Sequence, residues 1–277
     1  MSDLRAQDVV LGYEGRRVID GLRVSVAQQR FTAVVGPNAC GKSTLLRGLA
    51  RLLRPAGGVV LLDGADIHRL PTRVVATRLA VLPQQPVAPD GITVGDLVGR
   101  GRHPHQQWLR QWSRDDERAV AAALSATNLV ELAGRPVDEL SGGQRQRVWI
   151  ALVLAQETDL LLLDEPTSFL DLAHQLEVLD LLADLNCAGR TIVAVLHDLN
   201  MACRYAHEII VMRGGAVFAQ GPPEEIIDAG LVADVFGLRA RVITDPTTST
   251  PLVLPEARIR RRPDCSNVQL GDGRLER

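Results

Sequence analysis

Short apolar runs alternate along the chain with stretches in which apolar residues recur every three or four positions. The short runs are typical of buried strands, because each is apolar almost throughout and is bounded by turn residues. They are RFTAVVG (30–36), GVVLLDG (58–64), RLAVLPQ (78–84), TDLLLLDEP (158–166) and RTIVAVLHD (190–198). Strands that alternate with helices indicate an α/β fold whose sheet is mainly parallel.

Helical spacing is clearest in two parts of the chain. From Ser43 to Leu53, the leucines at every third or fourth position fall on one face of a helix. Between Pro86 and about Ala155 the strand pattern stops, and DDERAVAAALSATNLVEL and GQRQRVWIALVLAQ follow with amphipathic spacing. We therefore predict a helical subdomain over about residues 86–155, inserted in the α/β core.

The C-terminal third has a different pattern. EIIVMRGGAVFAQG (208–221) consists of two apolar runs separated by Gly214-Gly215, which predicts a β-hairpin. We expect one domain over residues 1–255 that ends in an accessory segment over about 226–255. Residues 256–277 contain an arginine run but no apolar periodicity, and we expect them to form a mobile, solvated tail whose role the sequence does not indicate.

Composition excludes several classes of protein. The 31 basic and 33 acidic residues nearly cancel, so no general attraction to nucleic acid or anionic lipid is expected. The four cysteines are scattered without a C-x-x-C pair, which argues against a zinc site or a disulfide scaffold and favours the cytosol. The N-terminus lacks a signal-peptide pattern, and the apolar runs are far shorter than the ~20 residues that span a bilayer. We expect a chain that is neither exported nor membrane-spanning.

The segment GPNACGKST (36–44) matches the phosphate-binding pattern G-x-x-x-x-G-K-[ST] between a predicted strand and a predicted helix. Backbone N–H groups of such a loop surround a β-phosphate, the lysine reaches β- and γ-phosphate oxygens, and the hydroxyl ligates Mg²⁺. We therefore predict that ATP binds here. The predicted ATP-binding residues of the loop are Gly36, Pro37, Asn38, Ala39, Cys40, Gly41, Lys42, Ser43 and Thr44.

A second nucleotide element is LLLLDEP, in which an apolar strand ends in Asp164 and Glu165. Side chains alternate along a strand, so the two carboxylates are expected to point in different directions and to have different roles. We predict that Asp164 holds Mg²⁺ together with Ser43. Glu165 would face the γ-phosphate and polarise the attacking water.

The segment LSGGQRQR (140–147) offers exposed N–H groups at a helix start, which suit a second anion. The first loop already holds its own nucleotide, so this second site needs a second ATP or a second chain. Here the sequence resembles the ATP-binding-cassette family, whose members dimerise head to tail so that each signature motif covers the partner's γ-phosphate. The resemblance assigns this role to Ser141, Gly142, Gly143 and Gln144.

The resemblance spans about residues 3–255 and implies further roles. Tyr13 would stack on adenine, and Asp171 would cross the dimer interface. His197 would contact the γ-phosphate, and Gln84 would contact Mg²⁺ and the attacking water, although Gln85 is adjacent and the choice depends on register. The family fold adds an antiparallel N-terminal β subdomain to the P-loop NTPase core and the helical subdomain.

The chain departs from the family pattern at a few positions. Ala39 stands where many relatives have glycine, Gln28-Gln29 replace a common Asp-Gly turn, and TSFLD replaces the usual Thr-Thr form. None of these changes removes a group from the predicted chemistry. Cys40 has two interpretations: an oxidisable thiol whose pKa is lowered by the helix N-terminus, or a small residue that fills the loop.

Within the family, the chain resembles ATPase subunits of iron–siderophore importers, of the ferric enterobactin type. The resemblance continues outside the general motifs, in VDELSGGQRQRVWIALVLAQET, VLHDLNMACRYAHEI and VFGLRARVITDP. It implies an ATPase that works as a homodimer on the cytoplasmic face of the membrane. Its partners would be polytopic permease subunits and, indirectly, a substrate-binding protein, with no nucleic acid. Haem, vitamin B12 and other metal chelates stay open as cargo.

Other interpretations fit the sequence less well. Residues 44–140 contain no sustained heptads of a DNA-repair cassette, and the single set of motifs differs from translation factors that carry two cassettes. A regulator that only binds ATP would lack Glu165 or His197. The histidines His103 and His105 have no carboxylate or thiol nearby in sequence, so we interpret them as packing or interface residues rather than an iron site.

Overall fold

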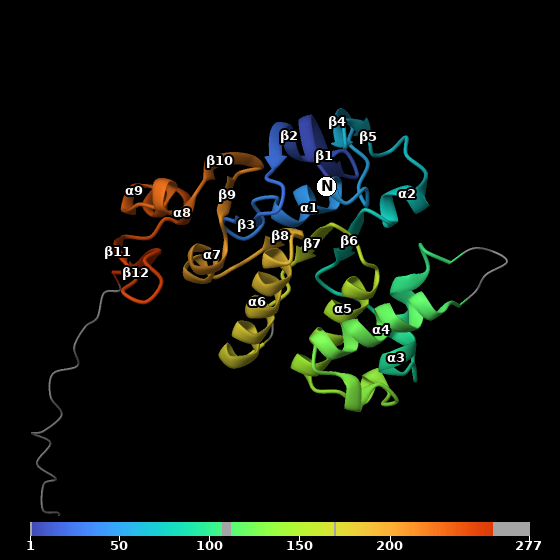
Figure 1. Ribbon diagram of the computed structural model, residues 1–277. Helices are drawn as coiled ribbons and strands as arrows, with labels where there is room; N and C mark the ends of the chain where they lie inside the picture. Colours follow the sequence, from blue (N-terminus) through green and yellow to red (C-terminus); the bar gives the residue numbers. More distant parts are fainter. Residues whose placement is uncertain (1, 107–111, 169, 257–277) are drawn as a thin grey trace, which may run out of the picture.

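The computed structural model describes residues 2–106, 112–168 and 170–256. A six-stranded sheet lies at its centre, in the order β10-β9-β3-β8-β7-β6 (Figure 1). The strands are β3 (Phe31–Val35), β6 (Leu79–Leu82), β7 (Leu160–Asp164), β8 (Thr191–Val195), β9 (Glu208–Arg213) and β10 (Ala216–Gly221). All neighbours pair in parallel except β9 and β10, which form the predicted hairpin.

A second, antiparallel sheet has the order β2-β1-β4-β5. Its strands are β1 (Leu4–Tyr13), β2 (Arg16–Val26), β4 (Gly57–Leu62) and β5 (Ala65–Asp66). The predicted strand 58–64 therefore belongs to this sheet, where it pairs with β1. The result confirms the mainly parallel core that the sequence pattern predicted and the antiparallel N-terminal sheet that the family resemblance implied.

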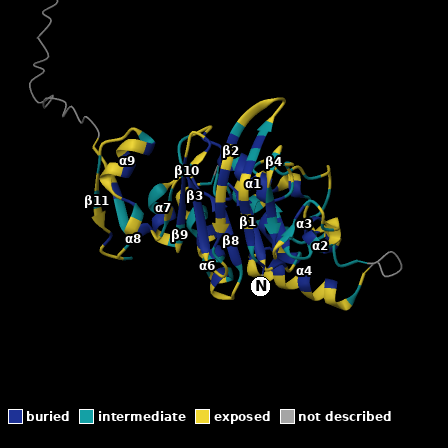
Figure 2. Ribbon diagram, turned by 90° about the horizontal axis from the view of Figure 1, so that it is seen from above, coloured by how far each residue is buried: buried dark blue, intermediate teal, exposed yellow. Residues whose placement is uncertain are grey.

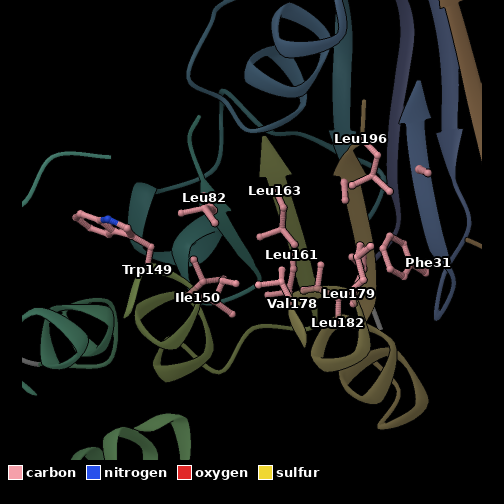
Figure 3. Close-up of a cluster of buried hydrophobic side chains, with 14 of the residues drawn as sticks. Phe31, Leu82, Trp149, Ile150, Leu161, Leu163, Val178, Leu179, Leu182 and Leu196 are labelled. Atoms are coloured by element: carbon pink, nitrogen blue, oxygen red, sulfur yellow. The ribbon is translucent and has the colours of Figure 1, made fainter. Parts of the chain in front are cut away.

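Two hydrophobic clusters cover the two faces of the central sheet, and β7 contributes alternately to both because successive side chains point to opposite faces. Leu160 and Leu162 pack with the antiparallel sheet and with α1 (Lys42–Leu49). Leu161 and Leu163 pack toward helices on the other face, where Figure 3 shows Ile150, Val178, Leu179 and Leu182. Burial on both faces explains why this strand is apolar throughout.

The helices that follow β6, β7 and β8 contribute to the hydrophobic cluster on the second face of the sheet. They are α3 (Val94–Gly99), α4 (Arg114–Ala126), α5 (Gly142–Ala155), α6 (Leu172–Cys187) and α7 (Leu199–Tyr205). The short helix α2 (Thr72–Ala76) precedes β6, and its Val75 belongs to the cluster on the first face. Single 3₁₀ turns occupy Arg100–Arg102, Val130–Leu132 and Val137–Glu139. In Figure 2 the central strands are buried, while yellow, exposed residues lie on the outer sides of the helices.

The first helix is shorter than the leucine pattern predicted. It ends at Leu49, and Arg51 adopts a left-handed conformation with φ 63°. Leu52 consequently lies outside the helix and is 62% exposed. The prediction of one apolar face up to Leu53 was therefore wrong, because the backbone turns before the last two leucines.

The C-terminal segment consists of α8 (Pro223–Ile226), α9 (Ala229–Phe236), β11 (Ala240–Thr244) and β12 (Pro251–Pro255). The β11–β12 hairpin is fixed to α7 by Asn200, whose side chain donates to the Val253 carbonyl at 3.1 Å and accepts from the Val253 N–H at 2.7 Å. Arg204 pairs with Asp245 at 3.0 Å. The predicted tail lies outside the described residues, apart from Glu256.

A buried ion pair holds the helices after β6 together. Arg102 is only 3% exposed, and its Nε donates to Asp116 Oδ1 at 2.9 Å. Its Nη1 also donates to the Ala155 carbonyl and to Glu157 Oε2, both at 2.7 Å. One guanidinium thus links the 3₁₀ turn that contains Arg102, α4 and the end of α5.

We expect Asp116→Asn to lower the free energy of unfolding by about 1–3 kcal/mol, because a hydrogen bond to a buried charged group is weakened. Burial raises the pKa of Asp116, but hydrogen bonds from Arg102 and Ser113 outweigh it, so the net pKa is lowered. A lowered native pKa stabilises the fold above the unfolded-state pKa, and this contribution is lost as pH falls through the native pKa. Denaturant titrations at several pH values should show the wild-type advantage shrinking with acidity. Arg135→Gln, at an exposed pair with Glu139, is the control and should change stability little.

Candidate ATP-binding and hydrolysis site

A cavity of about 950 Å³ lies at the carboxyl ends of β3, β7 and β8. This edge of a parallel sheet is where ligands bind in open α/β folds. The predicted residues that line the cavity are Tyr13, Asn38, Ala39, Gly41, Lys42, Ser43, Thr44, Gln84, Glu165 and His197. Segments far apart in the sequence therefore meet at one place.

The loop between β3 and α1 is shaped by its backbone. Gly36 has φ 151°, and a Cβ there would lie 2.2 Å from the Met212 carbonyl oxygen, so a side chain would not fit. Ala39 has φ 60°, a left-handed conformation that favours glycine, and the loop nevertheless accommodates its Cβ. The Lys42 ammonium is buried within the loop, where it donates to the Gly36 and Pro37 carbonyls at 2.9 Å each. The loop therefore already holds a positive charge next to the place where phosphate oxygens would bind.

Ser43 and Asp164 meet although 121 positions separate them in sequence. The Ser43 hydroxyl donates to Asp164 Oδ1 at 2.9 Å, and Asp164 is 2% exposed. Burial raises the pKa of Asp164, and the neighbouring Glu165 charge raises it further, while the Ser43 hydrogen bond acts in the opposite direction. A hydroxyl and a buried carboxylate are hard oxygen donors that suit Mg²⁺, and a cation would offset the cost of ionising Asp164.

Glu165 lies just past the end of β7, in a left-handed conformation with φ 55°. The two acids do point to different partners, but the cause is this backbone turn rather than strand alternation. Glu165 Oε1 is 2.6 Å from His197 Nε2, and its Oε2 accepts from Ser168 Oγ at 2.8 Å. Gln84 also donates to this carboxylate, so of the two adjacent glutamines the first contacts Glu165.

The protonation equilibria of the two adjacent acids are shifted in opposite directions. Burial raises the pKa of Glu165, but hydrogen bonds from Ser168, His197 and Gln84 outweigh it and lower the net pKa. Glu165 is thus kept ionised beside Asp164, whose pKa is raised. The two shifts have different causes, because burial dominates at Asp164 and the three hydrogen bonds dominate at Glu165.

Several residues of the cavity were not predicted as site residues. They are Glu14, Arg16, Arg17, Val18, Gly214 and Gly215. The two glycines were recognised only as a hairpin turn, yet Gly215 N–H donates to the Cys40 carbonyl at 2.9 Å, and a Cβ there would lie 2.0 Å from the Val18 carbonyl oxygen. Tyr13 lies at the cavity rim, 40% exposed, and its hydroxyl accepts from Arg47 at 3.3 Å. The β9–β10 hairpin turn therefore packs between β2 and the nucleotide loop and supports the loop backbone.

Cys40 does not have the lowered pKa that one interpretation required. Its side chain is buried, and burial raises the pKa of the thiol more than the nearby Lys42 charge lowers it. The geometry agrees with the other interpretation, in which Cys40 is a small residue that fills the loop.

The signature residues and Asp171 lie away from the cavity within the part of this chain that the structure describes. Ser141 caps the N-terminus of α5 in a capping box with Gln144. Both Ser141 and Gly142 are exposed. Asp171 caps α6 and is also exposed. One chain thus contains one complete phosphate loop and a separate, exposed helix start.

No group of three or more His, Cys, Asp or Glu side chains that could hold a metal ion occurs around His103 or His105, or elsewhere in residues 2–106, 112–168 and 170–256. His105 Nε2 instead contacts the Gln156 carbonyl oxygen at 2.7 Å, as expected for a packing residue. Across the same ranges, none of the helices has the length and apolar character needed to cross a bilayer.

The phosphate loop, the buried acid beside its serine and the adjacent glutamate in the same cavity together define a phosphate-loop nucleoside triphosphatase. The profile of the ABC transporter family matches residues 19–168, and the chain belongs to this family. It is 54% identical to YusV of Bacillus subtilis (strain 168), named as a probable siderophore transport system ATP-binding protein, over 93% of this chain and 94% of YusV. It is 51% identical to the ferric enterobactin transport ATP-binding protein FepC of Escherichia coli (strain K12), over 92% and 94% of the two chains.

Solved structures agree with this assignment. The dimeric structure of MJ0796, a bacterial ABC transporter cassette, superposes with a TM-score of 0.71 at 26% identity, over 79% of this chain and 98% of that one. The chain is therefore an ATPase that binds ATP and hydrolyses it to drive transport. Cassettes of this family work as dimers together with membrane subunits.

Proposed function

We propose that this chain is the ATP-hydrolysing subunit of an importer for ferric siderophore complexes. The observation that carries the proposal is the identity of 51–54% with YusV and FepC over more than nine-tenths of the chain. Identity of this extent includes the surface segments outside the nucleotide motifs, and these segments decide which membrane subunits the ATPase fits. The protein would lie on the cytoplasmic face of the membrane and bind separate permease subunits there.

Nucleotide binding begins at the loop between β3 and α1. The β- and γ-phosphate oxygens would replace the Gly36 and Pro37 carbonyls as acceptors of the Lys42 ammonium, which lies 2.9 Å from both. Ser43 and Asp164 would hold Mg²⁺, whose bound form supplies positive charge next to the phosphates. Tyr13 would stack on the adenine at the open end of the cavity.

Hydrolysis would use Glu165 as the base that orients the attacking water and takes its proton. The water oxygen forms a bond to the γ-phosphorus, and the bond to the oxygen that bridges the β- and γ-phosphates breaks. His197 and Gln84 hold the Glu165 carboxylate now and would contact the γ-phosphate and the water. Lys42 would neutralise the charge that develops on the phosphate oxygens.

Closure of the site would need a second copy of the chain. The exposed N-terminus of α5, with Ser141, Gly142, Gly143 and Gln144, has N–H groups and a helix dipole that suit an anion. The cavity of the same chain does not include them. A head-to-tail dimer would bring the signature turn of each copy to the γ-phosphate of the other, with Asp171 at the interface.

Reconstitution tests the cargo. The chain is co-expressed with the membrane protein that purifies with it, placed in liposomes with the binding protein of that system, and assayed for ATP hydrolysis. Ferric siderophores should stimulate turnover several-fold, while cobalamin and haem should not. Stimulation by cobalamin or haem alone would overturn the siderophore assignment, and recovery of ribosomes or DNA instead of a polytopic membrane protein would overturn the importer assignment.

A further inference from the structure

His174 contacts two segments that are both expected to face a second copy of the chain. Its Nδ1 lies 2.7 Å from Asp171 Oδ1, and its backbone N–H donates to the same oxygen at 2.9 Å. On the other side, the imidazole covers Gly143, where a Cβ would lie 2.9 Å from His174 Cδ2 and 3.1 Å from Cγ. One side chain thus connects the α6 cap with the first turn of α5.

Other contacts hold the same two helices but do not include Asp171. The Gln146 side chain donates to the Pro166 carbonyl at 2.7 Å, and Arg147 lies 3.7 Å from Glu177. The first contact fixes α5 against the segment that leads from β7 to α6, and the second lies between α5 and α6. Among the described contacts, the imidazole of His174 is what joins the Asp171 carboxylate to the signature turn.

We propose that His174 is a positioning residue that holds the Asp171 carboxylate and the signature turn in one fixed relation. Both elements then meet the second copy together. The Asp171 side chain is 67% exposed, and without the imidazole the helix-cap bond from the residue 174 backbone N–H would hold one carboxylate oxygen with less restraint on the rest of the side chain. Ordering an exposed side chain at an interface costs free energy on association, and a contact already made within the monomer removes that cost. The inference rests on the proposed function, in which the two copies close around ATP.

The test measures ATP-driven dimerisation in a Glu165→Gln background, in which turnover does not consume the nucleotide. We expect His174→Ala to raise the chain concentration for half-dimerisation by about tenfold, because the Asp171 side chain and the signature turn must then be ordered on association. ATP binding by the monomer, measured at low chain concentration, should not change, because His174 lies away from the cavity. The backbone N–H of residue 174 still donates to Asp171, so the helix cap and the melting temperature should be retained.

Two further variants separate the two contacts of the imidazole. Asn carries Nδ2 on Cγ, where His carries Nδ1, so His174→Asn should recover part of the dimerisation. His174→Phe covers Gly143 but cannot donate to Asp171, so it should remain impaired. His103→Ala removes an exposed histidine elsewhere and is the matched control.

A double-mutant cycle with Asp171→Ala completes the test. If His174 acts through Asp171, the double variant should dimerise no worse than Asp171→Ala alone. Unchanged dimerisation of His174→Ala, or additive effects in the cycle, would overturn the role of His174 and leave the proposed function standing. Failure of the Glu165→Gln parent to dimerise with ATP would overturn the head-to-tail closure itself, and the role of His174 with it.

Discussion

Glu165→Gln is expected to lower the rate of ATP hydrolysis by a factor of about 10²–10⁴, the range for loss of a general base. The amide keeps an oxygen that can accept from His197 or Ser168, which now lie 2.6 and 2.8 Å from the carboxylate oxygens. It cannot take a proton from water. ATP affinity should change little, because the Lys42 loop and the Ser43–Asp164 pair are untouched, and the ATP-bound dimer should accumulate. Phosphate release and light scattering after gel filtration measure the two effects.

Ser168→Ala is the matched control, because it removes one hydrogen bond and keeps the Glu165 carboxylate. The rate should fall by about tenfold or less, in line with the ~0.5–1.5 kcal/mol of one hydrogen bond. Since the Ser168 bond lowers the pKa of Glu165, its loss should move the acid limb of the pH–rate profile to higher pH. If Glu165→Gln kept a rate within tenfold of the wild type, Glu165 would not be the base.

The site could be predicted from the sequence wherever the chemistry lies within one short motif. The loop at 36–44 and the acids at 164–165 are both motifs for binding one nucleotide. The sequence therefore already predicted that they lie together, although 121 positions separate Ser43 from Asp164. Gln84 was assigned by resemblance, and its distinction from Gln85 needed the end of β6 at Leu82. A short motif thus identifies its residues from sequence alone, while the choice between two adjacent residues such as Gln84 and Gln85 requires the structure.

Residues that act through distant packing could not be predicted in this way. Gly215 reaches the Cys40 carbonyl because β9 pairs in parallel with β3, which puts the hairpin turn behind the loop. The contact of His174 with Gly143 depends on how α6 lies against α5. Neither arrangement leaves a periodic signal, since each involves one residue from each of two distant elements.

The fold shows the same division. The apolar run 58–64 was recognised as a strand, but its place in the antiparallel sheet depends on pairing with β1, which no local pattern encodes. Pairing between β11 and β12 likewise joins segments from Ala240 to Pro255 that have little apolar periodicity. Local sequence predicts the type of an element when burial is strong, and tertiary contacts decide its partners.

Lys42→Ala is expected to weaken ATP binding by about 10²–10³-fold, because roughly 3–4 kcal/mol of charge-assisted hydrogen bonding to phosphate is lost. The ammonium is 6% exposed and lies inside the loop, so no other cation of the loop can replace it. Calorimetric titration with a non-hydrolysable ATP analogue measures the affinity. The variant leaves the Gly36 and Pro37 carbonyls without their donor. The melting temperature without nucleotide is therefore measured as a control for a loss of stability.

The sequence permits a direct second measurement, because Lys42 is the only lysine among the 277 residues. The amines open to an amine-directed reagent are therefore this side chain, where it opens from the loop, and the amino terminus, and mass spectrometry separates the two. ATP should protect Lys42 and leave the amino terminus unaffected, since phosphate oxygens would surround the ammonium. Lys42→Arg keeps the charge on a larger, planar group, so partial binding is expected from it. Once labelling of Lys42 has been measured in the nucleotide-free chain, the same extent of labelling under saturating ATP would contradict its contact with phosphate, whatever the affinity of the alanine variant.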